Sequence, residues 1–504
     1  MPDLFRTAIA GSLAGSLASS ALASGVTIVT HGFNADMTWV NAMADAIARR
    51  AGGGSAPGIS VTRVNLVVTQ GANGLVVTQA PIAVAPEATF TTGEFVIGLD
   101  WTAIDSFQRG QPLPQPLPQP LPPDVGEDAT PTQNVAQAVF AYLQTWNYGG
   151  RPILAQPFHV IGHSRGGALV ASLARTMGES GVWVDQLTTL DPVPVALFGD
   201  AAARVVSTVV FADNIWQNVA LPSGSSLAGA FNQQMGNLGS GNHSLIHTWY
   251  YGTIDPLATG DGECASCINP AWYTSDVDTK PRAQSGFWYA RVAGGDRTGV
   301  QARAGLLSTL GGAATVGTNG RLAITTAQPA WPNVFQVQTD KATIAQGEAN
   351  TTDFYYQSAG ASVSASVYAS DDRNPAHGGT LLGTVALPAA STPTFASVGW
   401  ATTPAARSQP YNVYVAITGA GGRTRVDFDA FAVTVNAPAC PGDLTSDGFV
   451  DDADFVVFAG AYNLLVCSDP SMPPGCPADL NNDASVDDAD FVLFAAAYET
   501  LVCP

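Results

Sequence analysis

The sequence predicts several domains in a row: an α/β domain with a mostly parallel sheet covered by helices on both faces, a β-sandwich, and a small helical repeat. Three observations support this fold class. Apolar strand runs alternate with helical periods over residues 26–255, as in a parallel sheet with crossover helices. Short runs of alternating polarity, separated by Gly, Pro and Ser, fill residues 329–437. Finally, residues 440–475 realign with residues 476–504, which predicts two similar units that pack together.

Length and charge limit the possible functions. A chain of 504 residues is too long for one ordinary domain. Its 40 Asp and Glu outnumber its 20 Lys and Arg, which gives a net charge of −20. Residues 440–504 carry eleven Asp and Glu499 but no Lys or Arg. This balance argues against nucleic acid or anionic membranes as partners and suits calcium.

The N-terminal residues predict export. Arg6 is followed by a weakly apolar stretch, Ala8–Ala23, that ends in the small-residue cleavage pattern Ala21-Leu22-Ala23. Residues 1–23 therefore predict a signal peptide. The six cysteines have spacings that suit disulfides, and no later stretch is long and apolar enough to span a bilayer. We expect a secreted or cell-surface protein.

The α/β domain, residues 24–328, opens with the strand run Val26–Thr30, which ends in His31-Gly32-Phe33. Asp36–Arg50 then has a helical period. The elements predicted after it are, in order, a strand at Phe95–Leu99, a helix at Gln133–Trp146, a strand at His159–Gly162, a helix at Gly166–Met177 and strands near Gln186–Leu190 and Val205–Phe211. The Pro-Leu-Pro-Gln repeat in Gln111–Pro123 predicts an exposed polyproline II insert.

The segment Gly162-His163-Ser164-Arg165-Gly166 has the G-x-S-x-G pattern of a nucleophile elbow. It follows a predicted strand and precedes a predicted helix, so a sharp turn would raise the Ser164 hydroxyl above the sheet at a helix N-terminus. The pattern alone arises by chance in long chains, and its strand–turn–helix context gives it weight. We expect Ser164 to be a nucleophile.

A serine hydroxyl needs a base, and the base needs an orienting acid. Asp191 ends the next predicted strand, where the acid of a Ser…Asp…His chain order belongs. His243 and His247 are the candidate bases. Their i, i+4 spacing, followed by Cys264 and Cys267, also fits a zinc site, although C-x-x-C in an exported chain is more often a disulfide.

His31-Gly32-Phe33 has the place of the first half of an oxyanion hole, at the end of the first strand. The two donors would be the backbone N–H groups of Phe33 and Arg165.

Residues 26 to about 255 resemble a bacterial α/β-hydrolase of the lipase class. The segments that match this family in order are His31-Gly32-Phe33, Gly162 to Gly167, Leu190-Asp191-Pro192, Phe211 to Gln217 and His243 to Tyr250. In such relatives the catalytic histidine precedes an apolar residue and a Trp-Tyr pair, so the resemblance favours His243 over His247. It implies hydrolysis of ester or lipid substrates. The sequence has no clear strand before Val26, from which we expect a minimal sheet.

The middle domain, residues 329–437, is predicted to be a β-sandwich of the immunoglobulin or fibronectin type III kind. Its period-2 runs include Ala365–Tyr368 and Tyr411–Ile417. It carries no motif that we can connect to chemistry, so we interpret it as a spacer or a carbohydrate-binding-like module.

The last domain, residues 438–504, contains two predicted calcium loops of the EF-hand pattern, with oxygen ligands at loop positions 1, 3, 5, 7, 9 and 12. Position 7 contributes its backbone carbonyl. Gly448 stands at position 6 of the first loop and Ala484 at the same place in the second. The expected ligands are Asp443, Thr445, Asp447, Phe449, Asp451 and Asp454, then Asp479, Asn481, Asp483, Ser485, Asp487 and Asp490. They predict two structural Ca²⁺ ions.

Asp at position 12 and an apolar helix after each loop resemble a type I dockerin. The resemblance implies a cohesin-like partner, and attachment to a cell surface is an equal alternative. Cysteines bracket the two loops with the same spacing, Cys440 to Cys467 and Cys476 to Cys503. We expect one disulfide within each repeat, although four cysteines allow three connectivities.

The sequence thus predicts a secreted serine hydrolase of carboxylic esters, an esterase or a triacylglycerol lipase, that needs no cofactor for catalysis. Two alternatives stay open. An amidase or peptidase would use the same triad. A surface adhesion or scaffold protein would contain an inactive hydrolase domain.

Overall fold

The computed structural model describes residues 24–54, 58–82, 86–106, 130–273, 282–294, 320–326, 331–358, 360–436, 440–445, 447–481 and 483–499. The predicted signal peptide, the Pro-Leu-Pro-Gln segment and Cys503 lie outside these residues. Within them, no helix is long and apolar enough to cross a membrane.

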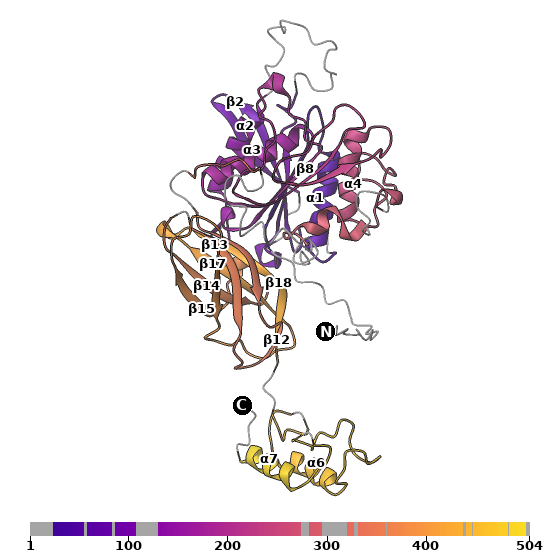
Figure 1. The fold of residues 1–504 in the computed structure, drawn as a ribbon, viewed down its shortest axis with the longest axis vertical. Coiled ribbons are helices and arrows are strands. Elements are labelled where there is room, and N and C mark those ends of the chain that lie inside the picture. Colours follow the sequence, from indigo (N-terminus) through magenta and orange to yellow (C-terminus); the bar gives the residue numbers. More distant parts are fainter. Residues whose placement is uncertain are drawn as a thin grey trace, which may run out of the picture. The chain divides into compact units, whose positions relative to one another are not determined.

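The chain has a mixed α/β architecture, with one large, mostly parallel sheet and further antiparallel sheets (Figure 1). The large sheet has the strand order β10-β9-β8-β7-β1-β4-β2-β3, and β2–β3 is its antiparallel pair. Its strands are β1 (Val26–Thr30), β2 (Thr62–Gly71), β3 (Gly74–Pro81), β4 (Phe95–Asp100), β7 (Phe158–His163), β8 (Val184–Leu190), β9 (Val209–Gln217) and β10 (Phe231–Met235). A separate two-stranded ribbon joins β5 (Asn147–Tyr148) and β6 (Arg151–Pro152).

The helices of this region are α1 (Thr38–Ala51), α2 (Thr132–Thr145), α3 (Arg165–Glu179) and α4 (Asn242–Ile254). They cover both faces of the sheet. The packing of β1 shows this, since successive residues of this strand lie in different apolar cores. In β1, Val26 and Ile28 pack in the core that includes α2 and α3, whereas Val29 packs with α1 and α4. The alternation explains why every residue of the central strands β1, β7 and β8 is buried.

The expectation of a minimal sheet was wrong. The sheet has eight strands because β4, β2 and β3 follow β1 in the chain but extend the sheet on its far side. The β2–β3 hairpin turns through Ala72-Asn73, with Gly71 paired to Gly74. Gly74 has φ +116°, a backbone conformation that favours glycine.

Residues 331–436 form two further sheets. The first has the order β11-β13-β16, with β11 (Asn333–Thr339), β13 (Thr351–Gln357) and β16 (Thr394–Gly399). The second has the order β12-β18-β17-β14-β15, with β12 (Thr343–Ala345), β14 (Val363–Ser370), β15 (Thr380–Leu387), β17 (Tyr411–Thr418) and β18 (Thr424–Asn436). All pairs are antiparallel except β12–β18. The period-2 runs that predicted strands lie in β14 and β17.

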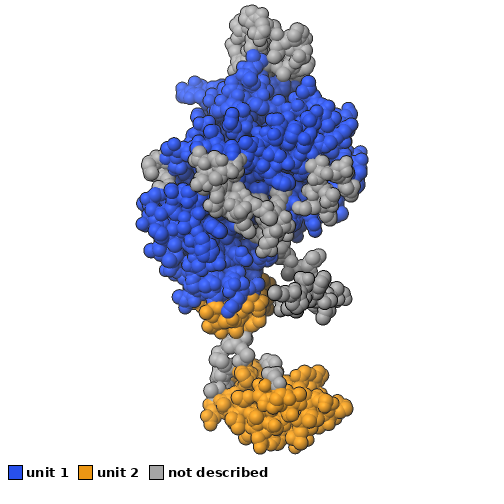
Figure 2. Space-filling model, in the orientation of Figure 1, with its two compact units in different colours: residues 1–342, 350–401, 411–433 blue, residues 343–349, 402–410, 434–504 orange. Residues whose placement is uncertain are grey.

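The chain divides into two compact units (Figure 2). The first comprises residues 1–342, 350–401 and 411–433, so the large sheet and most of the antiparallel strands belong to it together. Buried polar contacts join them: Nη1 and Nη2 of Arg425 donate to the carbonyls of Leu154 and Trp183 at 3.0 and 3.1 Å. On β11, Nδ2 of Asn333 donates to the carbonyl of Gly181 at 2.8 Å.

The second unit comprises residues 343–349, 402–410 and 434–504 and contains α6 (Asp452–Tyr462) and α7 (Asp488–Tyr498). The two helices share an apolar core that includes Val450, Phe458, Val486 and Phe494. The hydroxyl of Tyr462 donates to Asp488 at 2.5 Å, and the equivalent Tyr498 donates to Asp452 at the same distance. Each repeat therefore donates one tyrosine hydroxyl hydrogen bond to an aspartate of the other.

The expected disulfides within each repeat were wrong. Cys467 is bonded to Cys476, with 5.4 Å between their Cα atoms, so this bond connects the end of the first repeat to the start of the second. The pairing follows from the way the repeats pack: Val466, next to Cys467, forms an antiparallel bridge with Ser485 of the second loop.

Candidate active site

Ser164 lies in the turn between β7 and α3. Its backbone has φ +56° and ψ −124°, a region that residues with a side chain rarely adopt. Three backbone bonds hold this strained conformation: Ser164 N–H donates to Leu190 at 2.9 Å, and its carbonyl accepts from Gly167 and Val193, each at 3.0 Å. The strain is thus supported on both sides by the neighbouring strand end and the helix.

The glycines around the serine are needed because the neighbouring backbone leaves no room for a side chain at these positions. A Cβ atom on Gly162 would collide with the backbone of Gly166, and one on Gly166 would collide with the carbonyl of His31. A Cβ atom on Gly32 would lie 2.6 Å from that of Ser164. The segment after β1 and the segment after β7 are therefore in direct contact.

Asp191 follows β8, the strand beside β7, and is fully buried with φ +45°. Its carboxylate accepts four hydrogen bonds. Oδ1 accepts from the backbone N–H of Gln217 at 3.0 Å and of Gly224 at 2.7 Å. Oδ2 accepts from Nε2 of Gln217 at 2.8 Å and from Nδ1 of His243 at 2.6 Å. A buried carboxylate with this many donors is held in one orientation.

The structure separates the two candidate bases. His243, in the first turn of α4, pairs with Asp191, and its side chain is 15% exposed. His247, one turn further, is buried and pairs through Nδ1 with Asp261 at 2.8 Å, while its Nε2 lies 3.5 Å from Glu263. Burial alone would lower the pKa of His247, but its hydrogen bonds to Asp261 and Glu263 raise it. His243 is therefore the histidine that faces the predicted acid.

His163 lies between these two histidines. Its ring centroid is 4.6 Å from that of His243 and 4.8 Å from that of His247. Burial and the repulsion of the two neighbouring imidazoles hold its pKa well below the ordinary value, so the ring is neutral. Its Nε2–H donates to the backbone carbonyl of His243 at 2.9 Å, which links the residue before Ser164 to the first turn of α4.

The hydroxyl of Ser164 and the imidazole of His243 form no hydrogen bond among the described residues. Hydrogen bonds between a nucleophile and its base are often long in unliganded enzymes and shorten when substrate binds.

Arg165 is the first residue of α3, so its backbone N–H has no acceptor within the helix. Its buried guanidinium bonds to Asp200 through Nε and Nη2, at 2.7 and 2.8 Å, and to the carbonyls of Asp105 and Thr130. The rings of Trp101 and Phe198 lie 4.9 and 4.6 Å from its Cζ. This fixes the direction of the helix N-terminus behind the serine. The other predicted donor belongs to Phe33, whose ring stacks on Phe198 at 5.9 Å.

The alternative zinc site of His243, His247, Cys264 and Cys267 has no free thiolate ligands. Cys264 and Cys267 are bonded to each other, and His247 is engaged with Asp261. The groups of His, Cys, Asp and Glu that could hold a metal within the described chain include neither His243 nor His247.

Those groups include both predicted calcium loops. The carboxylates of Asp443, Asp447 and Asp454 lie within 4.8 Å of one another, and so do those of Asp479, Asp483 and Asp490. Each loop folds back onto its first residue, because backbone N–H groups at positions 5 and 6 donate to Asp443 and to Asp479.

The remaining predicted ligands lie around these triplets. Asp451 and Asp487 cap α6 and α7, each accepting a backbone N–H two residues on, at 2.8 Å. Thr445 and Asn481 donate their N–H groups to the position 12 residues Asp454 and Asp490. Phe449 and Ser485 donate theirs to the position 5 residues.

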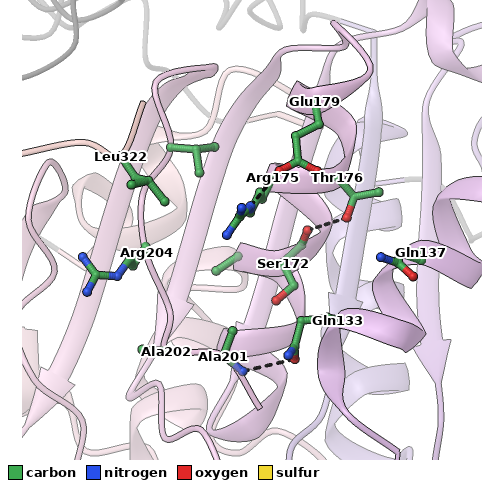
Figure 3. Close-up of a pocket in the computed structure, with 12 residues that line it drawn as sticks. Gln133, Gln137, Ser172, Arg175, Thr176, Glu179, Ala201, Ala202, Arg204 and Leu322 are labelled. Atoms are coloured by element: carbon green, nitrogen blue, oxygen red, sulfur yellow. Dashed lines mark hydrogen bonds and ion pairs between the residues drawn. The ribbon is translucent and has the colours of Figure 1, made fainter. Parts of the chain in front are cut away.

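A groove of about 200 Å³ lies away from the serine, between α2, α3 and the segment 201–206 (Figure 3). Its polar groups are largely satisfied by the protein itself. Arg175 pairs with Glu179 at 2.8 Å, Thr176 donates to the carbonyl of Ser172, and Gln133 accepts from Ala201. The groove contains no residue of the predicted triad.

Sequence reasoning missed Gln217, Asp200 and Asp261. Each is a partner of a predicted residue from another segment of the chain. Gln217 ends the segment Phe211 to Gln217 of the family resemblance, but its local sequence assigned it no role. One signal was available: a buried arginine requires an acid, so Arg165 within the elbow predicts a carboxylate partner.

No family model and no curated protein matches this chain. Among solved structures, the chain is similar to Pseudomonas fluorescens alkylpurine DNA glycosylase AlkC bound to DNA containing an abasic site analog, at 16% identity and a TM-score of 0.13. The similarity covers 20% of this chain and 30% of that chain. A likeness of this size carries no argument about the fold or the function.

Proposed function

We propose that this chain is an exported serine hydrolase of the α/β-hydrolase type that cleaves carboxylic esters with Ser164, Asp191 and His243. The observation that carries the proposal is the 2.6 Å pair of His243 and Asp191 beside a serine in a strained strand-to-helix turn. The segments that carry these residues follow β7, β8 and β10, and the predicted oxyanion segment follows β1. The carboxyl ends of these parallel strands lie at one edge of the sheet.

In the proposed reaction, Nε2 of His243 takes the proton of Ser164 as the serine oxygen attacks the ester carbonyl. Asp191 holds the imidazolium that forms. The backbone N–H groups of Phe33 and Arg165 bind the oxyanion, each contributing about 3 kcal/mol to the stability of the transition state. His243 then protonates the leaving alcohol, and water releases the acyl group by the same steps.

The surface beside the acid supports an apolar ester. The loop after β9 places Val219 and Leu221 at 48% and 90% exposure. This loop is held close to Asp191, because Gln217 binds both the acid and the backbone of Val219 and Ala220. Exposed aliphatic side chains at the rim of a site favour a substrate with an apolar acyl chain.

For the second unit we propose two structural Ca²⁺ ions in the loops 443–454 and 479–490. The oxygen-only donor sets, the close carboxylates and the left-handed backbone of Gly448 and Ala484 at position 6 fit calcium. A cohesin-like or cell-surface partner is the proposed role of the unit. The exposed Val456 and Val492, at equivalent places on α6 and α7, offer it an apolar contact. The disulfides support export.

The test is hydrolysis of p-nitrophenyl esters of graded acyl length by the full chain with calcium. Ser164→Ala is compared with Ser172→Ala, a serine of α3 outside the site. We expect hydrolysis that is lost in the first variant and kept in the second. A chain cleaving only amides would indicate a peptidase, and complete inactivity on both substrate classes would favour a surface scaffold.

A further inference from the structure

We propose that Gln217 is a positioning residue whose side-chain amide fixes the acid and the base of the triad against each other. The inference rests on the proposed function. Gln217 is the last residue of β9, the strand between the acid-bearing β8 and β10, after which the chain enters α4. Its side chain is fully buried.

The orientation of the amide is fixed by its partners. Oε1 accepts from the backbone N–H groups of Val219 and Ala220 at 2.8 and 2.9 Å, which can only donate. Nε2 faces Oδ2 of Asp191 at 2.8 Å and the carbonyls of Ala220 and Pro222 at 2.8 and 2.9 Å, which can only accept. The donor side of the amide therefore points at the acid.

Gln217 also reaches the helix that carries the base. Nδ2 of Asn242 donates to Oε1 of Gln217 at 3.2 Å, and Asn242 immediately precedes His243. Oδ1 of Asn242 accepts from Leu238 at 2.5 Å, so the first turn of α4 is held from two sides. One amide thus connects the carboxylate, the first turn of α4 and the loop 218–222.

Of the four hydrogen bonds to Asp191, Gln217 donates two, one from its backbone and one from its side chain. Removing the side-chain donor leaves a buried carboxylate with one donor fewer, so in the variant the carboxylate should be more basic and less firmly oriented about its Cβ–Cγ bond. Both effects act on the imidazole that shares Oδ2 with the amide.

The experiment compares Gln217→Leu and Gln217→Glu with Gln186→Leu. Gln186 is also fully buried in a strand, β8, but its amide donates to Thr188 and Asp213 rather than to the triad. A fluorophosphonate titration counts reactive serines, so kcat is expressed for each competent site. We expect kcat to fall about ten- to hundredfold in both Gln217 variants, with KM changed less than about threefold.

The pH profile separates positioning from stability. We expect the acidic limb of kcat/KM to move to higher pH in both Gln217 variants, furthest in Gln217→Glu, which adds a carboxyl group beside Asp191. Gln186→Leu should keep the wild-type profile for each titrated site, whatever its melting temperature. Wild-type kcat and profile in Gln217→Leu, or the same shifts in Gln186→Leu, would overturn the proposal. If the leucine variant does not fold, the isosteric glutamate variant decides.

A second readout needs no turnover. The Nδ1 proton of His243, bonded to Asp191, gives a far-downfield NMR resonance that His243→Ala identifies. We expect this resonance to move or disappear in Gln217→Leu and to remain in Gln186→Leu. An unchanged resonance in both would refute the positioning role. Absence of Ser164-dependent hydrolysis in the wild type would instead refute the proposed function, so the two failures are distinguishable.

Discussion

The backbone of Gly32 passes so close to Ser164 that a Cβ atom on the glycine would lie 2.6 Å from the Cβ atom of the serine. The same Cβ atom would lie 3.1 Å from the backbone nitrogen of Arg165. Gly32 therefore allows the segment after β1 to approach the nucleophile and one proposed oxyanion donor together.

Gly32→Ala should lower kcat by on the order of a hundredfold, because a methyl group here displaces the serine or the oxyanion segment further than catalysis tolerates. Steady-state kinetics measure this, with circular dichroism to verify folding. Gly399→Ala, on β16 with open space around its Cβ position, is the control and should be neutral. Normal turnover by the Gly32 variant would contradict the proposed oxyanion arrangement.

The two histidines of α4 should behave differently when replaced. His243→Ala should lower kcat/KM by about 10⁴-fold or more, the effect of removing a triad base. His247→Asn removes a buried pair with Asp261 and should lower the melting temperature, while kcat stays within about tenfold of wild type. The same ester assay and a thermal melt measure both. A larger loss of kcat/KM in His247→Asn than in His243→Ala would show that His247, and not His243, is the base.

The stability of the first unit should depend on pH through His247. Burial alone lowers the pKa of His247, but Asp261 and Glu263 raise it above its ordinary value in the folded chain. The charged pair therefore stabilises the fold fully below pH about 6.5, and this contribution is lost as pH rises through the raised pKa.

The difference in melting temperature between wild type and His247→Gln should accordingly be largest near pH 5.5 and shrink toward pH 9. Thermal melts at constant saturating calcium measure it. Asp261→Asn, which removes the partner, should reproduce the pH profile of His247→Gln. A difference that grows with pH would mean that the buried imidazole is neutral.

Ala484→Gly should make the second proposed calcium loop more stable or raise its affinity for calcium. Ala484 has φ +70° at the position where the first loop has Gly448 with φ +90°. An alanine in this left-handed region costs about 1 kcal/mol, so Ala484→Gly should raise the melting temperature or the calcium affinity of the unit by a corresponding amount. Gly448→Ala should do the opposite. Calorimetric calcium titration and a thermal melt of both variants decide, and unchanged affinity together with an unchanged melting temperature would show that position 6 is unstrained.

The residues whose place in the fold the sequence could predict are those whose position is set by a few neighbours in the chain. Ser164 stands in a strand–turn–helix pattern, Asp191 ends a strand, and the acidic loops repeat with fixed spacing. The mostly parallel sheet followed from the alternation of strand and helix runs. The β2–β3 hairpin was missed, because its two turn residues, Ala72-Asn73, are not one of the pairs that mark such a turn.

The partners of those residues could not be predicted, because contacts between distant segments leave no local pattern. Asp191 and Gln217 are brought together by the pairing of β8 with β9. The wrong disulfide assignment has the same cause. Equal spacing of cysteines suggested bonds within repeats, whereas the packing of one repeat on the other places Cys467 beside Cys476.

Replacing Arg425 by Met should destabilise the first unit. The buried guanidinium satisfies the carbonyls of Leu154 and Trp183, and each unsatisfied buried group costs about 1–3 kcal/mol. Arg407→Met is the control, since the half-buried Arg407 donates to the carbonyls of the exposed Gln409 and Pro410. Denaturant unfolding followed by tryptophan fluorescence measures the difference. Equal midpoints for the two variants would show that the buried contacts add nothing.

Arg425, which connects the antiparallel strands to the segments of the large sheet, limits how recombination can change the gene. A recombination event that removed the antiparallel strands would leave the carbonyls of Leu154 and Trp183 without their donor, and one that moved those strands elsewhere would bury Arg425 without acceptors. Selection should therefore keep the two parts in one lineage. The repeat that contains α6 and α7 has its own apolar core and disulfide, which are the properties expected of a domain that recombination can move as a unit.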